Sequence, residues 1–140
     1  MYRRVSRQRI TVKTILMIDD EMYARDYLAK LLENQGYRVF TAGNGEDGIG
    51  LFAQHRPDYV FLDVLLPGID GEEVFRQIKN IDPEAYIIFM TGTELIFSHQ
   101  DAVAMGARGY LPKPILPNQI LAAIRQAEQS SAVPPDPDKK

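Results

Sequence analysis

The sequence has 140 residues, 45% of them hydrophobic and 25% charged, which suits one globular domain and leaves no room for two. It contains no cysteine, which excludes disulfide frameworks, thiolate metal sites and cysteine nucleophiles. The formal net charge is −3, and residues 1–13 carry five basic side chains and no acid, so the remainder is more acidic than the whole. Such an acidic body argues against direct nucleic-acid binding by this domain.

Both ends of the chain differ in composition from the middle. Residues 1–12 are basic and lack the apolar run of a signal peptide, so we expect a disordered leader. Residues 130–140, SSAVPPDPDKK, are rich in proline and charge, and we expect a disordered tail or the start of a linker. Residues 13–129 then form the domain. No apolar run approaches the length of a membrane span, so we expect a cytoplasmic protein that does not bind membranes.

Short apolar runs alternate with helical patterns from residue 14 onward, which is typical of βαβ units and a parallel sheet. Residues 14–19, TILMID, predict the first strand, and it leads into three successive acids, Asp19, Asp20 and Glu21. A helix is expected next, ending at Gly36. Its apolar face is predicted from the spacing of Ala24, Tyr27, Leu28, Leu31 and Leu32.

Residues 37–42 predict the second strand, and Asn44 is a good N-cap for a helix that runs to about His55. This helix contains Gly48 and Gly50, each of which costs about 1 kcal/mol relative to alanine. The helix is therefore either weak or tightly packed.

The stretch YVFLDVLL, residues 59–66, is almost wholly apolar and reads as a strand buried on both faces. Its one carboxylate, Asp63, would cost several kcal/mol if it were buried unpaired, so it must end the strand or be matched by cations. Asp70 and Glu73 then have capping-box spacing at the start of a third helix.

Residues 86–90 predict a fourth buried strand that stops at Thr91, and a less regular helical segment follows over residues 94–105. The triplet Leu95, Ile96 and Phe97 cannot lie on one side of a helix, so some apolar surface should be exposed. Two interpretations stay open for this surface: a loop packed on the core, or a binding face for a partner.

Residues 109–114, GYLPKP, predict the fifth strand, and Pro112 within it favours a position at the sheet edge. The last helix begins near Pro117. Its apolar face is predicted to contain Ile120, Leu121, Ile124 and Ala127.

Four of the five expected strands end on a chemically useful group. These groups are Asp19 with Asp20, Asp63, Thr91 and Lys113. Each has an ordinary interpretation when taken alone, as a solvated turn or a surface lysine. The carboxyl ends of parallel strands lie along one edge of the sheet, however, and open α/β sheets bind ligands there. Together the residues predict a functional site.

From these residues and from LDVLLPGIDG and GYLPKP, the chain resembles the receiver domain of bacterial two-component response regulators over roughly Lys13 to Gln129. The resemblance implies an α/β, flavodoxin-like, doubly wound (βα)5 fold with a five-stranded parallel sheet in the order 2-1-3-4-5. It also implies that Asp63 is a phosphoacceptor that forms an aspartyl phosphate.

The resemblance further implies a magnesium site that neutralises the crowded acids. Asp20 and Asp63 are expected as direct ligands, Asp19 mainly through water, and Leu65 through its backbone carbonyl. Because neither Leu65 nor Thr93 readily orients an attacking water, we expect slow self-dephosphorylation.

Lys113 and Thr91 are expected to contact the phosphoryl oxygens, and the Lys113-Pro114 bond is expected to be cis. Thr91 and Tyr110 are expected to form a two-state switch that a partner reads. The hypothetical partner or homodimer face contains Leu95, Ile96, Phe97 and Tyr110.

The expected function is therefore that of a phosphoacceptor, phosphorylated by a histidine kinase or a histidine phosphotransfer protein, that signals to a downstream protein target. It would catalyse only its own magnesium-dependent phosphorylation and dephosphorylation, and is not an enzyme in the usual sense. Because no output domain is recognised, it is either a single-domain regulator or part of a longer one.

The main alternative is a pseudo-receiver that binds proteins without being phosphorylated. A phosphohydrolase of the haloacid dehalogenase type is disfavoured because Leu65 stands where it needs a second aspartate. A flavodoxin-like cofactor carrier is disfavoured because the acids Asp19, Asp20 and Glu21 would repel a phosphate.

Overall fold

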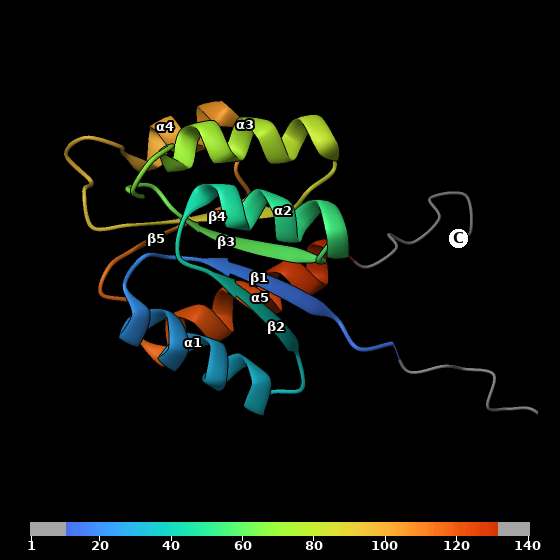
Figure 1. Cartoon of the computed structure of the whole chain (residues 1–140). Helices are drawn as coiled ribbons and strands as arrows, with labels where there is room; N and C mark the ends of the chain where they lie inside the picture. Colours follow the sequence, from blue (N-terminus) through green and yellow to red (C-terminus); the bar gives the residue numbers. More distant parts are fainter. Residues whose placement is uncertain (1–10, 132–140) are drawn as a thin grey trace, which may run out of the picture.

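The structure is a computed structural model that describes residues 11–131 (Figure 1). In this part of the chain five strands alternate with five helices. The strands are β1 Thr14–Ile18, β2 Arg38–Ala42, β3 Tyr59–Asp63, β4 Ile87–Thr91 and β5 Gly109–Pro112. The helices are α1 Met22–Asn34, α2 Gly45–His55, α3 Gly71–Ile81, α4 His99–Met105 and α5 Pro117–Ser131. Most of the expected leader and tail lies outside the described residues.

The strands run parallel in the order β2-β1-β3-β4-β5, which confirms the predicted doubly wound topology. The central strand β3 pairs with β1, where Leu62 lies opposite Ile18, and with β4, where Asp63 lies opposite Met90. Every residue of β3 and β4 is buried, as expected for strands covered on both faces. The edge position of β5 is also as predicted, and Pro112 is its last residue.

Helices α1 and α5 cover one face of the sheet, and α2, α3 and α4 cover the other (Figure 1). Because successive side chains of a strand point to opposite faces, each strand contributes to two cores. The core on the α2 to α4 side contains Leu16, Leu62 and Phe89, and the core on the α1 and α5 side contains Met17 and Phe61. With both faces covered, the strand ends are the part of the sheet that ligands can reach.

The starts of α2 and α3 follow from local capping chemistry. The Asn44 side chain accepts a hydrogen bond from the Asp47 amide at 2.8 Å, and the Asp70 side chain accepts one from the Glu73 amide at 3.0 Å. Within α2, a Cβ on Gly48 would lie 2.5 Å from Ile18 Cδ1, so this glycine lets the helix approach β1 closely. Of the two alternatives left by the sequence, α2 is therefore the tightly packed helix.

The segment after β4 differs from the prediction. The helix begins at His99 and not near residue 94, because Ser98 and Asp101 form a reciprocal capping box that starts it there. Phe97 is only 3% exposed and belongs to the core, so its assignment to a partner surface was wrong. Leu95 and Ile96 are 102% and 75% exposed, as expected of a triplet that cannot bury every member.

Two further boundaries are shifted. β5 ends at Pro112, two residues before the predicted end at 114, and the Lys113-Pro114 bond that follows is cis. α5 continues through Ser131, past the domain boundary predicted at residue 129. Among residues 11–131, no helix combines the length and apolar character needed to cross a bilayer.

Candidate functional site

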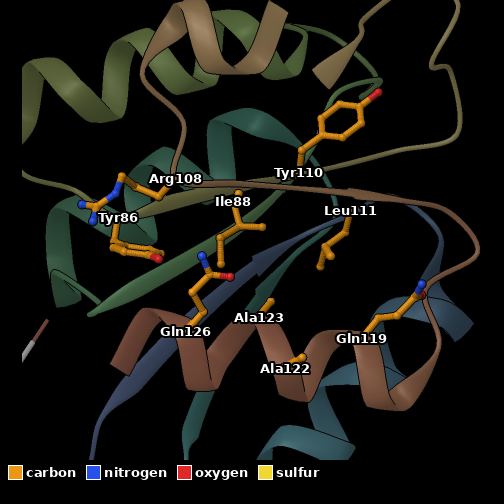
Figure 2. Close-up of a pocket in the computed structure, with 10 residues that line it drawn as sticks. Tyr86, Ile88, Arg108, Tyr110, Leu111, Gln119, Ala122, Ala123 and Gln126 are labelled. Atoms are coloured by element: carbon orange, nitrogen blue, oxygen red, sulfur yellow. The ribbon is translucent and has the colours of Figure 1, made fainter. Parts of the chain in front are cut away.

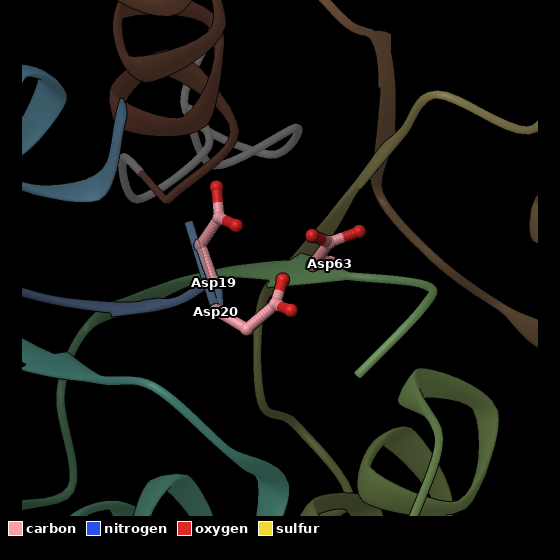
Figure 3. Close-up of side chains that lie close together, drawn as sticks. All are labelled: Asp19, Asp20 and Asp63. Carbon is pink, nitrogen blue, oxygen red and sulfur yellow. The ribbon is translucent and has the colours of Figure 1, made fainter. Parts of the chain in front are cut away.

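The chemically useful residues meet at the carboxyl edge of the sheet, as parallel pairing requires. Asp19 follows β1, Asp63 ends β3, Thr91 ends β4 and Lys113 follows β5. Figure 3 shows Asp19 and Asp20 leaving the end of β1 beside Asp63 at the end of β3. One carboxylate oxygen from each of these three aspartates lies within 4.8 Å of the others.

Lys113 crosses the edge of the sheet to reach two of these acids. Its Nζ lies 2.8 Å from Asp63 Oδ2 and donates a second hydrogen bond to Asp19 Oδ1 at 3.1 Å. Glu21 Oε1 lies 3.7 Å from the same ammonium. The Asp19 side chain is fully buried and the Lys113 side chain is 19% exposed, so the ion pairs are only partly screened by water.

Thr91 and Tyr110 lie on the adjacent strands β4 and β5, where Thr91 is opposite Pro112 and Tyr110 is opposite Phe89. Thr91 is fully buried, and its Oγ1 accepts a hydrogen bond from the Thr93 amide at 2.8 Å. The half-buried Tyr110 donates its hydroxyl to the Phe97 carbonyl at 2.7 Å, and its ring stacks on His99 with centroids 5.2 Å apart. Tyr110 thereby ties the edge strand to the loop before α4.

A family model described as the response regulator receiver domain matches residues 15–125 of the chain. The chain belongs to this family. The receiver domain is 39% identical over 122 residues to the transcriptional regulatory protein AfsQ1 of Streptomyces coelicolor, a match covering 84% of this chain and 54% of AfsQ1. It is 34% identical over 124 residues to the response regulator MprA of a Mycobacterium species, covering 89% of this chain and 54% of MprA. The chain thus spans about half the length of these relatives.

Solved receiver structures share the fold. A receiver domain protein from Clostridium thermocellum is 31% identical, with a TM-score of 0.79, covering 85% of this chain and 96% of that one. A CheY-like receiver domain protein from Methanospirillum hungatei is 25% identical, with a TM-score of 0.79, covering 86% of this chain and 100% of that one.

Burial and the neighbouring charges shift the pKa values of Asp63 and Lys113 in this receiver domain. The pKa of Asp63 is raised to about 6, first by burial and also by the neighbouring Asp19, although the hydrogen bond and charge of Lys113 act to lower it. Burial lowers the pKa of Lys113, but its hydrogen bonds and attraction to Asp63 and Asp19 outweigh that effect and leave the pKa raised. Three carboxylates, from Asp19, Asp20 and Asp63, thus gather around the one ammonium group of Lys113.

The donor set fits a divalent cation. Asp19 Oδ2 is buried and accepts no hydrogen bond, although Lys113 Nζ lies 3.1 Å away. The three carboxylates offer only oxygen ligands, which hard cations such as Mg²⁺ prefer. The Leu65 amide lies 3.3 Å from Asp63 Oδ1, while the Leu65 side chain is 54% exposed. The role of the Leu65 carbonyl as a ligand stays a prediction.

A cavity of about 410 Å³ opens beside the acids, between α1 and the segment that joins β5 to α5. Its lining includes Glu21, Tyr27, Lys113 and Ile115. Tyr27, which the helical spacing placed on the buried face of α1, is 57% exposed and belongs to this rim. Glu21 was not predicted as a partner of Lys113, although its place directly after the acid pair was a usable signal in the sequence.

A second hollow, of about 280 Å³, lies between β5 and α5 (Figure 2). It is separate from the acids and is lined in part by Tyr86, Arg108 and Leu111. Figure 2 shows the Tyr110 ring turned away from α5. The ring therefore joins the α4 side of the domain, where its hydroxyl meets the Phe97 carbonyl.

Proposed function

We propose that this receiver domain takes a phosphoryl group onto Asp63 from a phosphohistidine of a histidine kinase or histidine phosphotransfer protein. A carboxylate oxygen of Asp63 attacks phosphorus, an O–P bond forms, and the P–N bond to imidazole breaks, with the imidazole leaving to take up a proton. The supporting observation is the convergence of Asp19, Asp20 and Asp63 with Lys113 at one edge of the sheet.

Different residues around Asp63 would stabilise different parts of the phosphoryl group. Lys113 Nζ already lies 2.8 Å from Asp63 and supplies a positive charge for a phosphoryl oxygen. The Thr91 hydroxyl accepts from the Thr93 amide, which leaves its own proton free to donate. Asp19, Asp20, Asp63 and the Leu65 carbonyl would hold Mg²⁺, which when bound neutralises charge on the acids and the phosphoryl oxygens.

The acceptor is tested by intact-mass spectrometry after incubation with acetyl phosphate, with Mg²⁺ and with EDTA. We expect the wild type to gain one phosphoryl group only with Mg²⁺, and Asp63→Asn to gain none, because its amide is not a nucleophile. Asp82→Asn, at the far end of α3, is the matched control and should be phosphorylated like the wild type. No gain by the wild type in any condition would favour the pseudo-receiver.

The signal would leave through the loop before α4. Tyr110 bonds to the Phe97 carbonyl, so a movement of Tyr110 coupled to Thr91 would displace the exposed Leu95 and Ile96. We therefore retain Leu95, Ile96 and Tyr110 as the face for a downstream protein or a second copy. Leu95→Ser with Ile96→Ser should weaken phosphorylation-dependent association by about tenfold, as measured by analytical ultracentrifugation. Unchanged association would rule this face out.

A further inference from the structure

Arg25, on the first turns of α1, places a largely buried guanidinium group against the end of β1. Its side chain is 17% exposed, and Nη1 donates a hydrogen bond to the backbone carbonyl of Asp19 at 3.1 Å. Nε is buried without a hydrogen bond, although a carboxylate oxygen of Asp26 lies 3.5 Å away. Holding the group here therefore costs desolvation, and the contact that it makes is with the main chain of the acidic site.

The carbonyl that Arg25 contacts belongs to the peptide unit between Asp19 and Asp20. The orientation of this unit sets the directions in which both side chains leave the main chain. The amide of Asp19, which belongs to the preceding peptide unit, donates a hydrogen bond to the Ala42 carbonyl at the end of β2, at 3.0 Å. The main chain of Asp19 is thus held from α1 and from β2 at once.

Gly43, directly after β2, is the glycine that admits the guanidinium. A Cβ at this position would lie 2.8 Å from Arg25 Nη1 and 4.0 Å from its Cζ, and apart from the two neighbouring residues no other atom of residues 11–131 would lie within 4 Å of it. Its φ is not positive, in contrast to Gly36, Gly68 and Gly106. The backbone conformation therefore does not require glycine at position 43. Glycine is required because the Arg25 guanidinium occupies the space that a Cβ would take.

We propose that Arg25 is a positioning residue for the cation site, and that Gly43 is glycine to leave room for it. The assignment rests on the proposed function, in which Asp19 and Asp20 face Mg²⁺. The positive charge of Arg25 by itself would repel a cation. If Arg25 acts by positioning the aspartates, displacing or removing it should weaken Mg²⁺ binding. If it acts only through its charge, the same change should strengthen Mg²⁺ binding, so the two roles can be distinguished.

Gly43→Ala is the decisive variant because it displaces the guanidinium without changing any charge. The clashing atom is the end of a flexible side chain, so the fold should survive with a nearly unchanged urea midpoint. We expect the Kd for Mg²⁺, measured by calorimetry on the full chain, to rise by about tenfold, the scale seen when groups that orient metal ligands are lost. Gly50→Ala, with open space around its Cβ, is the matched control and should keep the wild-type Kd.

The same substitution in an Arg25→Ala background tests whether the effect runs through Arg25. With the guanidinium gone, Gly43→Ala should change the Kd by less than about twofold, so the two substitutions should be strongly non-additive. If Gly43→Ala kept the wild-type Kd for Mg²⁺, or weakened Mg²⁺ binding equally with and without Arg25, the role assigned to Arg25 would be wrong. The proposed function would not be affected. Failure of the wild type to bind Mg²⁺ would overturn the metal site of the proposed function, and this assignment with it.

Discussion

Replacing Lys113 with methionine is expected to lower the free energy of unfolding by about 3 kcal/mol in the absence of divalent cations. The ammonium contacts Asp63 at 2.8 Å and Asp19 at 3.1 Å, and both carboxylates are buried. Methionine fills similar space but leaves these acids without their cation, and uptake of a proton by Asp63 would limit the loss. Urea unfolding followed by circular dichroism, in EDTA at about pH 7.5, measures the change.

Magnesium should restore much of the stability lost in Lys113→Met, because a bound cation neutralises the same carboxylates and stabilises the folded state by mass action. Lys30→Met, an exposed position on α1, is the matched control and should change stability by less than about 0.5 kcal/mol with or without Mg²⁺. If Lys113→Met were as stable as the wild type in EDTA, the ion pairs seen here would not contribute to folding.

Replacing Asp63 with asparagine is expected to raise the free energy of unfolding by about 2 kcal/mol at about pH 8 without Mg²⁺. Burial raises the pKa of the folded-state carboxyl from 3.8 to about 6, so the native state binds the proton more tightly than the unfolded chain does. The wild type therefore loses stability as pH rises from about 4 to about 6, and asparagine removes that cost.

The advantage of Asp63→Asn should be greatest above about pH 7 and vanish below about pH 3, where the wild-type carboxyl is protonated in both the folded and the unfolded state. Urea midpoints at several pH values in EDTA test this sign directly. Glu33→Gln, an exposed change on α1, should show no comparable trend. A wild type that gained stability relative to Asp63→Asn as pH rose would show that Lys113 outweighs burial at this site.

The part of the site that could be predicted from sequence was the part that depends on strand ends. Asp19, Asp63, Thr91 and Lys113 each stand where an apolar run stops, and parallel pairing brings all such ends to one edge. Capping residues are similarly local signals, as Asn44 and Asp70 show. The start of α4 was predicted near residue 94 because the capping spacing of Ser98 and Asp101, a local signal in the sequence, did not enter that prediction.

By itself, then, the sequence determined the α/β class and the residues that gather at the acidic edge, because hydrophobic periodicity and strand ends are properties of neighbouring residues. The strand order followed from the resemblance to receiver domains and not from periodicity. Only the tertiary structure decided that Phe97 is buried while Ile96 is exposed, and that Gly43 leaves room for Arg25. These outcomes depend on contacts between residues far apart in the chain. Their geometry is set by how α1, β2 and the loop before α4 pack on the sheet, which no local spacing records.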